Sequence, residues 1–500
     1  MTCKDLQNVD FQDVQDAPTE LMTAQQIEAT ADVPAHCLVD GYILPQVGFG
    51  MKLPLSGWNG KFLMMGCGGL CGTLRIGLTS CDDGLRRGYA CATTDLGHSS
   101  TGNPASKRIA ADRIWAYNNL QAEVDHGFRA VHVATLAAKA ITTRFYSGSP
   151  KHSYFMGCSD GGREALSQAQ DFPWNYDGII SIDPAANISK SNFTHHMAWL
   201  AISKNGQSLF SPSDVDFIAD SVMRACDPVD GLKDGVIDDP RMCKFDPGAL
   251  QCRPDKTGKA GKCLTAEQVA AARKLYAGPR TASGEQIYYG PVLGGEKGDN
   301  AFNSTGRFAD VFRYTAFSPD PGPTWTQNDF DINTDYKRLG VMGKLWNAAN
   351  PDLRAFKGAG GKLIMAQGWD NGGSSNTLAN VDYYEMVERV MNGRAATQDF
   401  ARLFMMPGRD HCGRGPGANA IDFLSYLESW VEKKQAPDMM LASHLDPATA
   451  ARSDYTQAPT DPAKVGFTRP LYPYPLRAKY KGKGDPNDYR NFGPVEANTK

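Results

Sequence analysis

The chain of 500 residues has no long apolar run and no excess of charge of either sign. No stretch of about 18 consecutive apolar residues occurs, so the sequence predicts no transmembrane helix. Lys and Arg number 52 against 55 Asp and Glu, which gives a formal net charge of −3 and none of the basic excess typical of nucleic-acid binders. With 41% hydrophobic and 21% charged residues the composition can fill a core, which excludes general disorder. We therefore expect neither a nucleic-acid nor a membrane partner.

The cysteines point to a compartment outside the cytoplasm. There are 12 of them, an even number, and none forms a C-x-x-C pair, which argues against zinc. Cys67, Cys71, Cys81 and Cys91 are the alternative set for a zinc site, but disulfides are favoured. The first six residues lack the apolar stretch of a signal peptide and are typical of the start of a mature domain. The sequence predicts a secreted or periplasmic protein whose signal has been removed.

Short apolar runs bounded by turn residues recur along the chain and predict buried parallel strands. They lie at 61–66, 89–95, 153–157, 178–183, 362–368 and 403–408. Between them, residues 112–145 and 420–433 carry apolar side chains at helical spacing. Strands that alternate with helices indicate an α/β fold with a parallel sheet.

The alternation stops near Pro184 and resumes near Gly360. A structureless connection of this length would be unusual in a compact protein, so we expect residues 184–359 to form an inserted lid domain above the sheet. The catalytic domain would then consist of residues 1–183 and 360–500. We expect the Pro-, Tyr- and Lys-rich tail from Pro470 onward to pack as an extended strap.

The sharpest motif is G-x-S-x-G at residues 157–161, between an expected strand and an expected helix. This setting is typical of a nucleophile elbow, in which glycines leave room for a sharp turn and the serine hydroxyl stands clear of the sheet. The motif predicts Ser159 as a nucleophile. An ordinary glycine-rich turn is the alternative.

A serine nucleophile needs a base, and the base needs an orienting acid. In α/β-hydrolases the chain order is Ser, acid, His. His411 follows the strand 403–408 in a glycine-rich loop, and Asp370 follows the strand 362–368, so these two are the candidates. Asp382 and Asp410 are the rival acids. The other histidines are interpreted as surface or structural.

Two backbone N–H groups are needed to stabilise the oxyanion. We expect one from Asp160, directly after the nucleophile, and one from Gly68 or Gly69 after the strand 61–66. The alternative for these glycines is a flexible turn. Cys158 and Cys412 flank the proposed nucleophile and base, so a meeting of Ser159 and His411 would bring the two cysteines together, and a disulfide would tie both loops.

A second cluster of polar residues lies in the expected lid. Carboxylates spaced by three and four residues, separated by glycines, suit a hard cation that prefers oxygen ligands. An acidic solvated turn is the alternative. The predicted structural Ca²⁺ ligands are Asp227, Asp230 and Asp234 with the carbonyls of Leu232 and Val236.

Together these motifs resemble the tannase and feruloyl esterase family, which includes mono(2-hydroxyethyl) terephthalate hydrolases. The resemblance rests on the residues 157–164, the pair His411–Cys412, the loop from Cys226 to Cys243, and the tail 469–482. It covers nearly the whole chain. It implies an α/β-hydrolase fold with a large inserted lid that carries calcium. It also implies a triad of Ser159, Asp370 and His411 and the disulfides Cys158–Cys412, Cys226–Cys243 and Cys252–Cys263.

The chain departs from the family pattern at two places. Where the family has Gly-Trp-x-Asp, this sequence has Gly368, Trp369, Asp370 and Asn371, so the acid is displaced by one residue. The family's C-terminal disulfide is missing, and the added cysteines 67, 71, 81 and 91 have no assigned partners.

We therefore expect a secreted serine esterase that hydrolyses aromatic carboxylic esters of the feruloyl (hydroxycinnamoyl) type. Galloyl esters and mono(2-hydroxyethyl) terephthalate are the alternative substrates. A peptidase on the same fold is a rival within enzymes, and a calcium-dependent binding module is the rival outside them. The sequence leaves the oligomeric state open.

Overall fold

The computed structural model describes residues 1–99, 112–253, 262–298, 301–304, 309–371, 376–413, 415–445 and 462–497. All predicted site residues fall within these ranges. The expected lid, 184–359, also includes residues 254–261, 299–300 and 305–308, which lie outside the described part.

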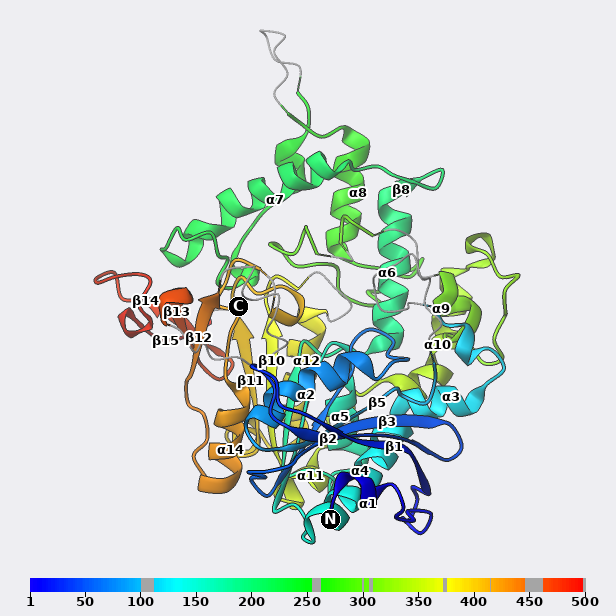
Figure 1. Ribbon diagram of the computed structural model, residues 1–500. Helices are drawn as coiled ribbons and strands as arrows, with labels where there is room; N and C mark the ends of the chain where they lie inside the picture. Colours follow the sequence, from blue (N-terminus) through cyan, green and yellow to red (C-terminus); the bar gives the residue numbers. More distant parts are fainter. Residues whose placement is uncertain are drawn as a thin grey trace.

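A nine-stranded sheet forms the centre of the molecule (Figure 1), in the order β1-β2-β3-β5-β4-β6-β7-β10-β11. The six strands from β5 to β11 in this order run parallel, whereas β1, β2 and β3 pair antiparallel with one another and β3 pairs antiparallel with β5. The six runs predicted as parallel strands are therefore confirmed, whereas the antiparallel strands β1, β2 and β3 at this edge were not predicted. The strands are β1 Thr19–Ile27, β2 His36–Ile43, β3 Val47–Pro54, β4 Lys61–Met65, β5 Ala90–Thr94, β6 His152–Cys158, β7 Gly178–Ile182, β10 Lys362–Gly368 and β11 Ala401–Met406.

Helices cover both faces of the sheet, and each face has its own apolar cluster. One cluster includes Ala134 and Ala137 of α4 with Leu166 of α5, and the other includes Leu427 and Trp430 of α14. This three-layer arrangement confirms the α/β prediction. The helices of this part are α1 Cys3–Leu6, α2 Arg75–Arg86, α3 Leu120–Val124, α4 Ala130–Tyr146, α5 Asp160–Asp171, α11 Arg354–Gly358, α12 Thr377–Val390, α13 Arg394–Gln398 and α14 Phe423–Lys433.

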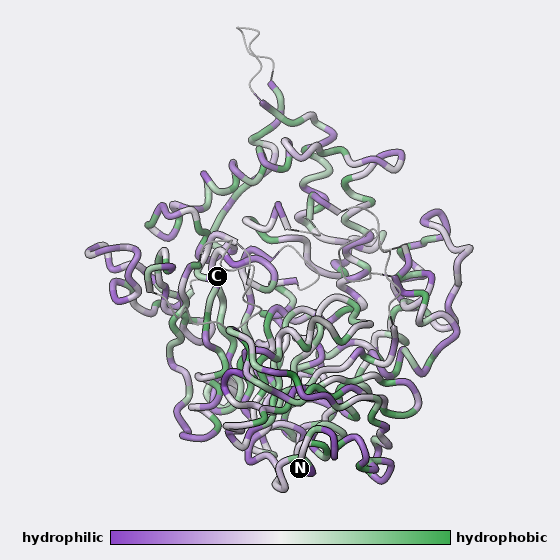
Figure 2. Tube along the Cα trace, viewed as in Figure 1, coloured by the Kyte–Doolittle hydropathy of each residue, from purple (hydrophilic) through white to green (hydrophobic). Residues whose placement is uncertain are grey.

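The described residues between β7 and β10 contribute no strand to the main sheet, and most of them lie above it (Figure 1). It has apolar clusters of its own, one around Ile218 and Leu275 and one around Phe312 and Trp325. Hydrophobic residues lie along both the sheet and these upper helices, whereas the outer loops are mostly hydrophilic (Figure 2). The boundaries 184 and 359 stay predictions. The elements are α6 Ile188–Ile202, β8 Ser203–Lys204, β9 Gln207–Ser208, α7 Pro212–Cys226, α8 Ala266–Ala277, α9 Ala309–Tyr314 and α10 Ile332–Trp346.

Two expected segments differ in detail. The helix expected over 112–145 is divided into a short turn at Ile114–Ala116, α3, a π-helical segment at Asp125–Arg129, and α4. The tail expected as a strap contains paired strands, with β13 Val465–Leu471 beside β12 Met440–Leu445 and a hairpin of β14 Leu476–Tyr480 with β15 Phe492–Glu496. No helix in the described ranges combines the length and apolar character needed to cross a bilayer.

Candidate active site

Ser159 lies at a sharp turn between β6 and α5. Its backbone has φ 65° and ψ −119°, a conformation that is strained for a residue with a side chain. The turn is held because the N–H of Ser159 donates to the carbonyl of Ile182 at 3.0 Å and the N–H of Ala185 donates to the carbonyl of Ser159 at 3.1 Å. A Cβ on Gly157 would lie 2.4 Å from the carbonyl oxygen of Gly161, so a larger residue does not fit. This is the geometry expected of a nucleophile elbow.

Asp160, whose N–H is the predicted oxyanion donor, lies in the first turn of α5. Asp160 is the first residue of the helix, so its N–H has no intrahelical acceptor. Its buried carboxylate is bound by Arg163 through two nitrogens, at 2.6 and 3.1 Å. Arg163 is fully buried and also donates to the carbonyls of His126 and Gly127. These contacts fix the start of the helix beside Ser159.

The glycine-rich loop after β4 lies against the elbow. A Cβ on Gly66 would be 2.8 Å from the Cα of Gly161, so the two backbones are in close contact. Gly68 is half-buried, whereas Gly69 is exposed with φ 67°. The disulfide Cys67–Cys71 closes the loop. The start of this loop, Gly66 and Cys67, is therefore in contact with the nucleophile turn, and of the two candidate glycines Gly68 is the more enclosed.

A buried acid of α5 ties this loop to the helix. The N–H of Cys67 donates to Oε1 of Glu164 at 3.3 Å. Glu164 is 2% exposed, and burial, followed by the charge of Asp160, raises its pKa well above the usual range.

The loop after β11 carries His411 and is joined covalently to the elbow. His411 begins a short turn, His411–Gly413, in which Cys412 has the left-handed φ of 55°. Cys412 forms a disulfide with Cys158, with the two Cα atoms 5.9 Å apart. Because these cysteines adjoin Ser159 and His411 in the sequence, the bond brings the two expected catalytic residues into neighbouring loops.

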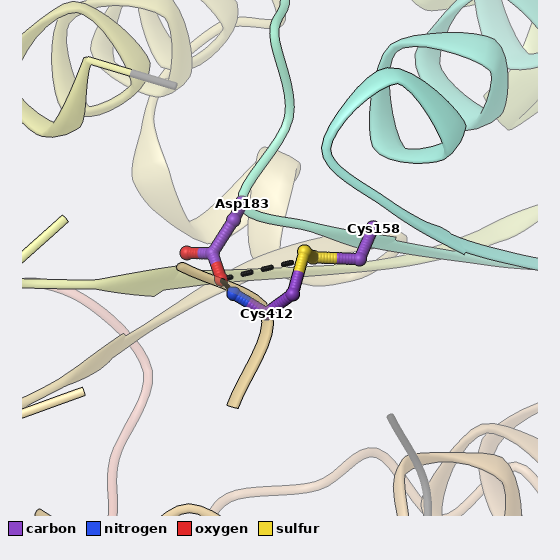
Figure 3. Close-up of side chains that lie close together, drawn as sticks. All are labelled: Cys158, Asp183 and Cys412. Carbon is purple, nitrogen blue, oxygen red and sulfur yellow. Dashed lines mark hydrogen bonds between the residues drawn. A yellow bond between two sulfur atoms is a disulfide. The ribbon is translucent and has the colours of Figure 1, made fainter. Parts of the chain in front are cut away.

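Asp183, which the sequence interpretation did not single out, lies at the centre of these loops (Figure 3). It directly follows β7 and is fully buried. Its Oδ2 accepts from the N–H of Cys412 at 2.9 Å and lies 3.8 Å from Sγ of Cys158, and its Oδ1 accepts from the N–H of Gly368 at 2.8 Å. One carboxylate thus joins the ends of β6, β7 and β10 to the histidine loop. Its position at the end of an apolar run was the available signal.

The segment after β10 places Asp370 and Asn371 differently. The side-chain nitrogen of Asn371 is 3.2 Å from Nδ1 of His411. Asp370 is buried, faces Glu296 and Asp410, and accepts a hydrogen bond from the N–H of Gly408. Burial, then the charge of Glu296, raises the pKa of Asp370 well above its usual range. In the described contacts it is therefore Asn371, and not the predicted Asp370, that meets the imidazole.

Asp382, one of the two rival acids, and several of the remaining histidines have other surroundings. Asp382 lies within α12 and accepts a hydrogen bond from the hydroxyl of Tyr289. His98, His126, His195 and His196 are buried rather than at the surface. His196 is enclosed by Phe312, Phe330 and Trp325, and burial lowers its pKa to about 4. This histidine is a neutral core residue.

The predicted calcium loop turns at two glycines with positive φ, Gly231 and Gly235. Asp227 accepts hydrogen bonds from the N–H groups of Asp234 and Gly235, and Asp230 accepts from the N–H of Leu232. The N–H of Val236 donates to Asp234, whose second oxygen is 2.7 Å from Arg469. Burial, together with the charges of Asp234 and Asp227, raises the pKa of Asp230 to about 6.

The carboxylates of this loop repel one another, and a bound Ca²⁺ would neutralise that repulsion. The set of oxygen donors therefore fits this ion. Within the described ranges, the one group of three potential ligand side chains with donor atoms inside 4.8 Å is Cys158, Asp183 and Cys412. Its cysteines are joined in a disulfide, so they offer no thiolate to a metal. A cation in the lid loop would have to draw Asp227, Asp230 and Asp234 closer together.

All twelve cysteines are paired. The three pairs that the family resemblance implied, Cys158–Cys412, Cys226–Cys243 and Cys252–Cys263, are present. The other three, whose partners the sequence left open, are Cys3–Cys37, Cys67–Cys71 and Cys81–Cys91. The alternative of a zinc site at cysteines 67, 71, 81 and 91 is therefore wrong, because all four sulfurs are used in disulfides.

A cavity of about 440 Å³ opens beside Asn371, a size suited to a small organic ligand. Its walls come from α6, α8, the segment 278–291 and the segment after β10. Apolar and polar side chains both line it. They include Thr194, His195, Met197, Leu275, Tyr288, Tyr289, Ile332, Asn371 and Asn376.

The three-layer sheet, the strained serine turn at the end of β6 and the histidine loop after β11 define an α/β-hydrolase-type enzyme. The family model described as "Tannase and feruloyl esterase" matches residues 31–495. The chain therefore belongs to the tannase and feruloyl esterase family and is a carboxylic ester hydrolase.

Two curated relatives and two solved structures illustrate the similarity. A mono(2-hydroxyethyl) terephthalate hydrolase from Piscinibacter sakaiensis is 32% identical, with 93% of this chain and 85% of the relative covered. A probable feruloyl esterase from Arthroderma benhamiae is 31% identical, with 88% and 81% covered. Feruloyl esterase B from Aspergillus oryzae has a TM-score of 0.82 at 23% identity, covering 95% and 97%. Tannin acyl hydrolase from Aspergillus niger has a TM-score of 0.76 at 21% identity, covering 100% and 95%. The two structures establish the fold.

Proposed function

We propose that this protein is a secreted or periplasmic serine esterase that hydrolyses aromatic carboxylic esters of the feruloyl type. The observation that carries the proposal is the disulfide Cys158–Cys412, which links the residue before Ser159 to the residue after His411. The family membership supports an ester substrate, and Tyr288 and Tyr289 in the wall of the cavity beside Asn371 suit an aromatic one. Six disulfides support an oxidising compartment.

In the proposed reaction the hydroxyl of Ser159 attacks the ester carbonyl while His411 takes its proton. The N–H of Asp160 and that of Gly68 or Gly69 stabilise the negative oxygen of the tetrahedral intermediate. His411 then returns the proton to the departing alcohol, which leaves an acyl group on Ser159. A water molecule gives a proton to His411, attacks the acyl group and releases the acid as Ser159 regains its proton. Asp370, the acid that the sequence predicts, and Asn371, whose side chain contacts His411, are the two candidates for orienting the imidazole ring.

The test compares wild type with Ser159→Ala on methyl ferulate, methyl gallate, mono(2-hydroxyethyl) terephthalate and a p-nitrophenyl alkanoate. We expect turnover of methyl ferulate that falls by about 10³-fold or more in the variant, since the nucleophile is lost. Ser429→Ala in α14 is the matched control and should retain full activity. Equal turnover by Ser159→Ala and wild type would contradict the assignment.

The same panel separates the alternative substrates. A terephthalate ester is favoured as the second candidate by the curated relative of 32% identity, and a galloyl ester by the tannin acyl hydrolase fold. Serine-dependent turnover of one of these, with methyl ferulate left intact, would replace the feruloyl proposal and keep the serine esterase. A matching peptide amide in the panel tests the peptidase alternative.

Ca²⁺ is proposed as a structural ion of the loop at Asp227, Asp230 and Asp234, with the carbonyls of Leu232 and Val236. When bound, the ion would supply positive charge that neutralises the crowded carboxylates. Metal analysis of the purified protein should find about one Ca²⁺ per chain, and chelation should lower Tm. Asp230→Asn should lower the calcium content. An unchanged Tm after exhaustive chelation, with no calcium found, would remove the ion from the proposal.

A further inference from the structure

The contact between Asn371 and His411 carries an inference that rests on the proposed function. Nδ2 of Asn371 is 3.2 Å from Nδ1 of His411, and Asn371 is 2% exposed. The backbone before it is anchored, because the N–H of Trp369 donates to the carbonyl of Met406 at 2.9 Å and that of Asp370 to the carbonyl of Arg409 at 3.2 Å. The amide is therefore held against the ring nitrogen that faces away from the nucleophile in a serine triad.

The carboxylate of Asp370 has other partners. It accepts from the N–H of Gly408 and faces Glu296, and no hydrogen bond or ion pair joins it to His411 in the described part of the chain. Gly294 closes its other side, since a Cβ there would lie 3.4 Å from Oδ1 of Asp370. This carboxyl group is enclosed between Gly294 and Glu296 of the lid and Gly408 after β11.

We propose that Asn371 is the residue that positions His411, by holding its ring through Nδ1. Rotation of the amide by 180° exchanges Oδ1 and Nδ2 in the same space. With Oδ1 against the ring, Nδ1 carries the proton and Nε2 is free to accept the proton of Ser159. With Nδ2 against the ring, Nε2 carries the proton and His411 cannot act as the base. A neutral amide thus allows two tautomers, where a carboxylate would select one.

The side chain at position 371 should control the rate and the pH dependence of the reaction. In a serine triad, an amide in place of the carboxylate lowers kcat by about 10⁴-fold because it favours the wrong tautomer and leaves the imidazolium unstabilised. If Asn371 holds this place, Asn371→Asp should raise kcat by about tenfold or more with little change in KM. A carboxylate beside the ring also favours the protonated imidazole, so the acid limb of the kcat/KM profile should move to higher pH by about one to three units.

Asp370→Asn is the discriminating variant, because it is nearly isosteric and alters the rival candidate one residue away. We expect its kcat to stay within about twofold of wild type and its acid limb to stay in place. The double variant Asp370→Asn with Asn371→Asp keeps the net charge of the chain and should behave as Asn371→Asp alone. In ¹⁵N-labelled protein, the ring nitrogen shifts of His411 should indicate more Nδ1–H in Asn371→Asp than in wild type.

The opposite pattern would overturn the inference. If Asp370→Asn lowers kcat by about 10²-fold or more while Asn371→Asp changes neither kcat, the pH profile nor the nitrogen shifts, then Asp370 is the orienting acid. Wild type and Ser159→Ala are assayed in parallel. Absence of serine-dependent turnover in wild type contradicts the proposed function, whereas serine-dependent turnover that is indifferent to residue 371 contradicts this inference alone.

Discussion

The catalytic loops and the lid are held together by different kinds of bonds. At the end of the sheet that carries Ser159, the disulfide Cys158–Cys412 joins cysteines 254 residues apart, and Asp183 accepts N–H groups from residues 185 and 229 positions away. In the lid, Cys226–Cys243 and Cys252–Cys263 span 17 and 11 residues. Apolar packing of Phe312, Trp325 and their neighbours also holds the lid together.

This difference indicates how each region can change. The catalytic loops depend on one another, so a local change there alters the distance between Ser159 and His411. The lid is built from local units, so a change in one unit leaves the others in place. If the proposed function holds, we expect acyl specificity to vary with the lid while Ser159 and His411 stay in place, and the following variants test that division.

The largest expected effect comes from the two disulfides. Loop closure entropy predicts that removing Cys158–Cys412, which spans 254 residues, lowers the free energy of unfolding by about 5 kcal/mol. Removing Cys226–Cys243, which spans 17, should lower it by about 3 kcal/mol. Both pairs are changed to Ala and measured by denaturant unfolding and by ester turnover. We expect the first variant to lose kcat as well as stability, and the second to retain kcat.

A lid variant that loses as much kcat as the catalytic variant would contradict this division. Far-ultraviolet circular dichroism on each variant separates loss of fold from loss of alignment. A catalytic variant that keeps its secondary structure and loses kcat is the expected result.

The next effect concerns Asp183. In Asp183→Asn, one of the two N–H groups, that of Cys412 or that of Gly368, faces an NH₂ group, and the other faces an amide oxygen that is a weaker acceptor than a carboxylate. We therefore expect the histidine loop to shift. A misplacement of about 1 Å costs on the order of 10²-fold in rate, and we expect a loss of kcat of that size. Asp177→Asn is the control, because Asp177 accepts the N–H of Ser153 at the other end of the sheet and should retain activity within about twofold. Equal kcat in the two variants would show that Asp183 does not align the loops.

The smallest effect arises where the two regions meet. Burial raises the pKa of Glu296, whose usual value is 4.5, to about 7. The folded protein keeps this proton where the unfolded chain has lost it, so the stability from Glu296 is complete below about pH 4.5 and is lost as the pH rises toward 7. Glu296→Gln should flatten this dependence in denaturant unfolding between about pH 5 and pH 8, whereas the exposed Glu285→Gln should leave it unchanged. An unaltered slope in Glu296→Gln would exclude this group as the cause.

The sequence predicted the parallel part of the sheet because buried strands appear as continuous apolar runs. It did not predict β1, Thr19–Ile27, where polar residues alternate with apolar ones at the edge of the sheet. The π-helical segment at Asp125–Arg129 was also missed. Arg163 of α5 donates to the carbonyls of His126 and Gly127. These carbonyls therefore have a hydrogen-bond partner outside their own helix.

For the site, motifs led to Ser159 and His411 because each follows an apolar run within a glycine-rich turn. Asp183 follows such a run too, but its partners Gly368 and Cys412 are far away in the sequence. Asn371 carries an amide, whereas the triad pattern predicts a carboxylate at this place. The contacts of Asp183 and Asn371 form only when the ends of several strands meet in the folded protein. The local spacing of residues in the sequence does not predict such contacts.

The order of the cysteines has a consequence for how the protein is made. Five of the six disulfides join consecutive cysteines, so each can close as soon as its second member has been synthesised. Cys158 is the exception, since its partner Cys412 is the last cysteine of the chain. An oxidant acting during synthesis would join Cys158 to Cys226, the next cysteine to appear, and would displace the lid pairs as well. Recombinant production should therefore give more active enzyme in a host compartment that contains a disulfide isomerase than in one that contains an oxidant alone.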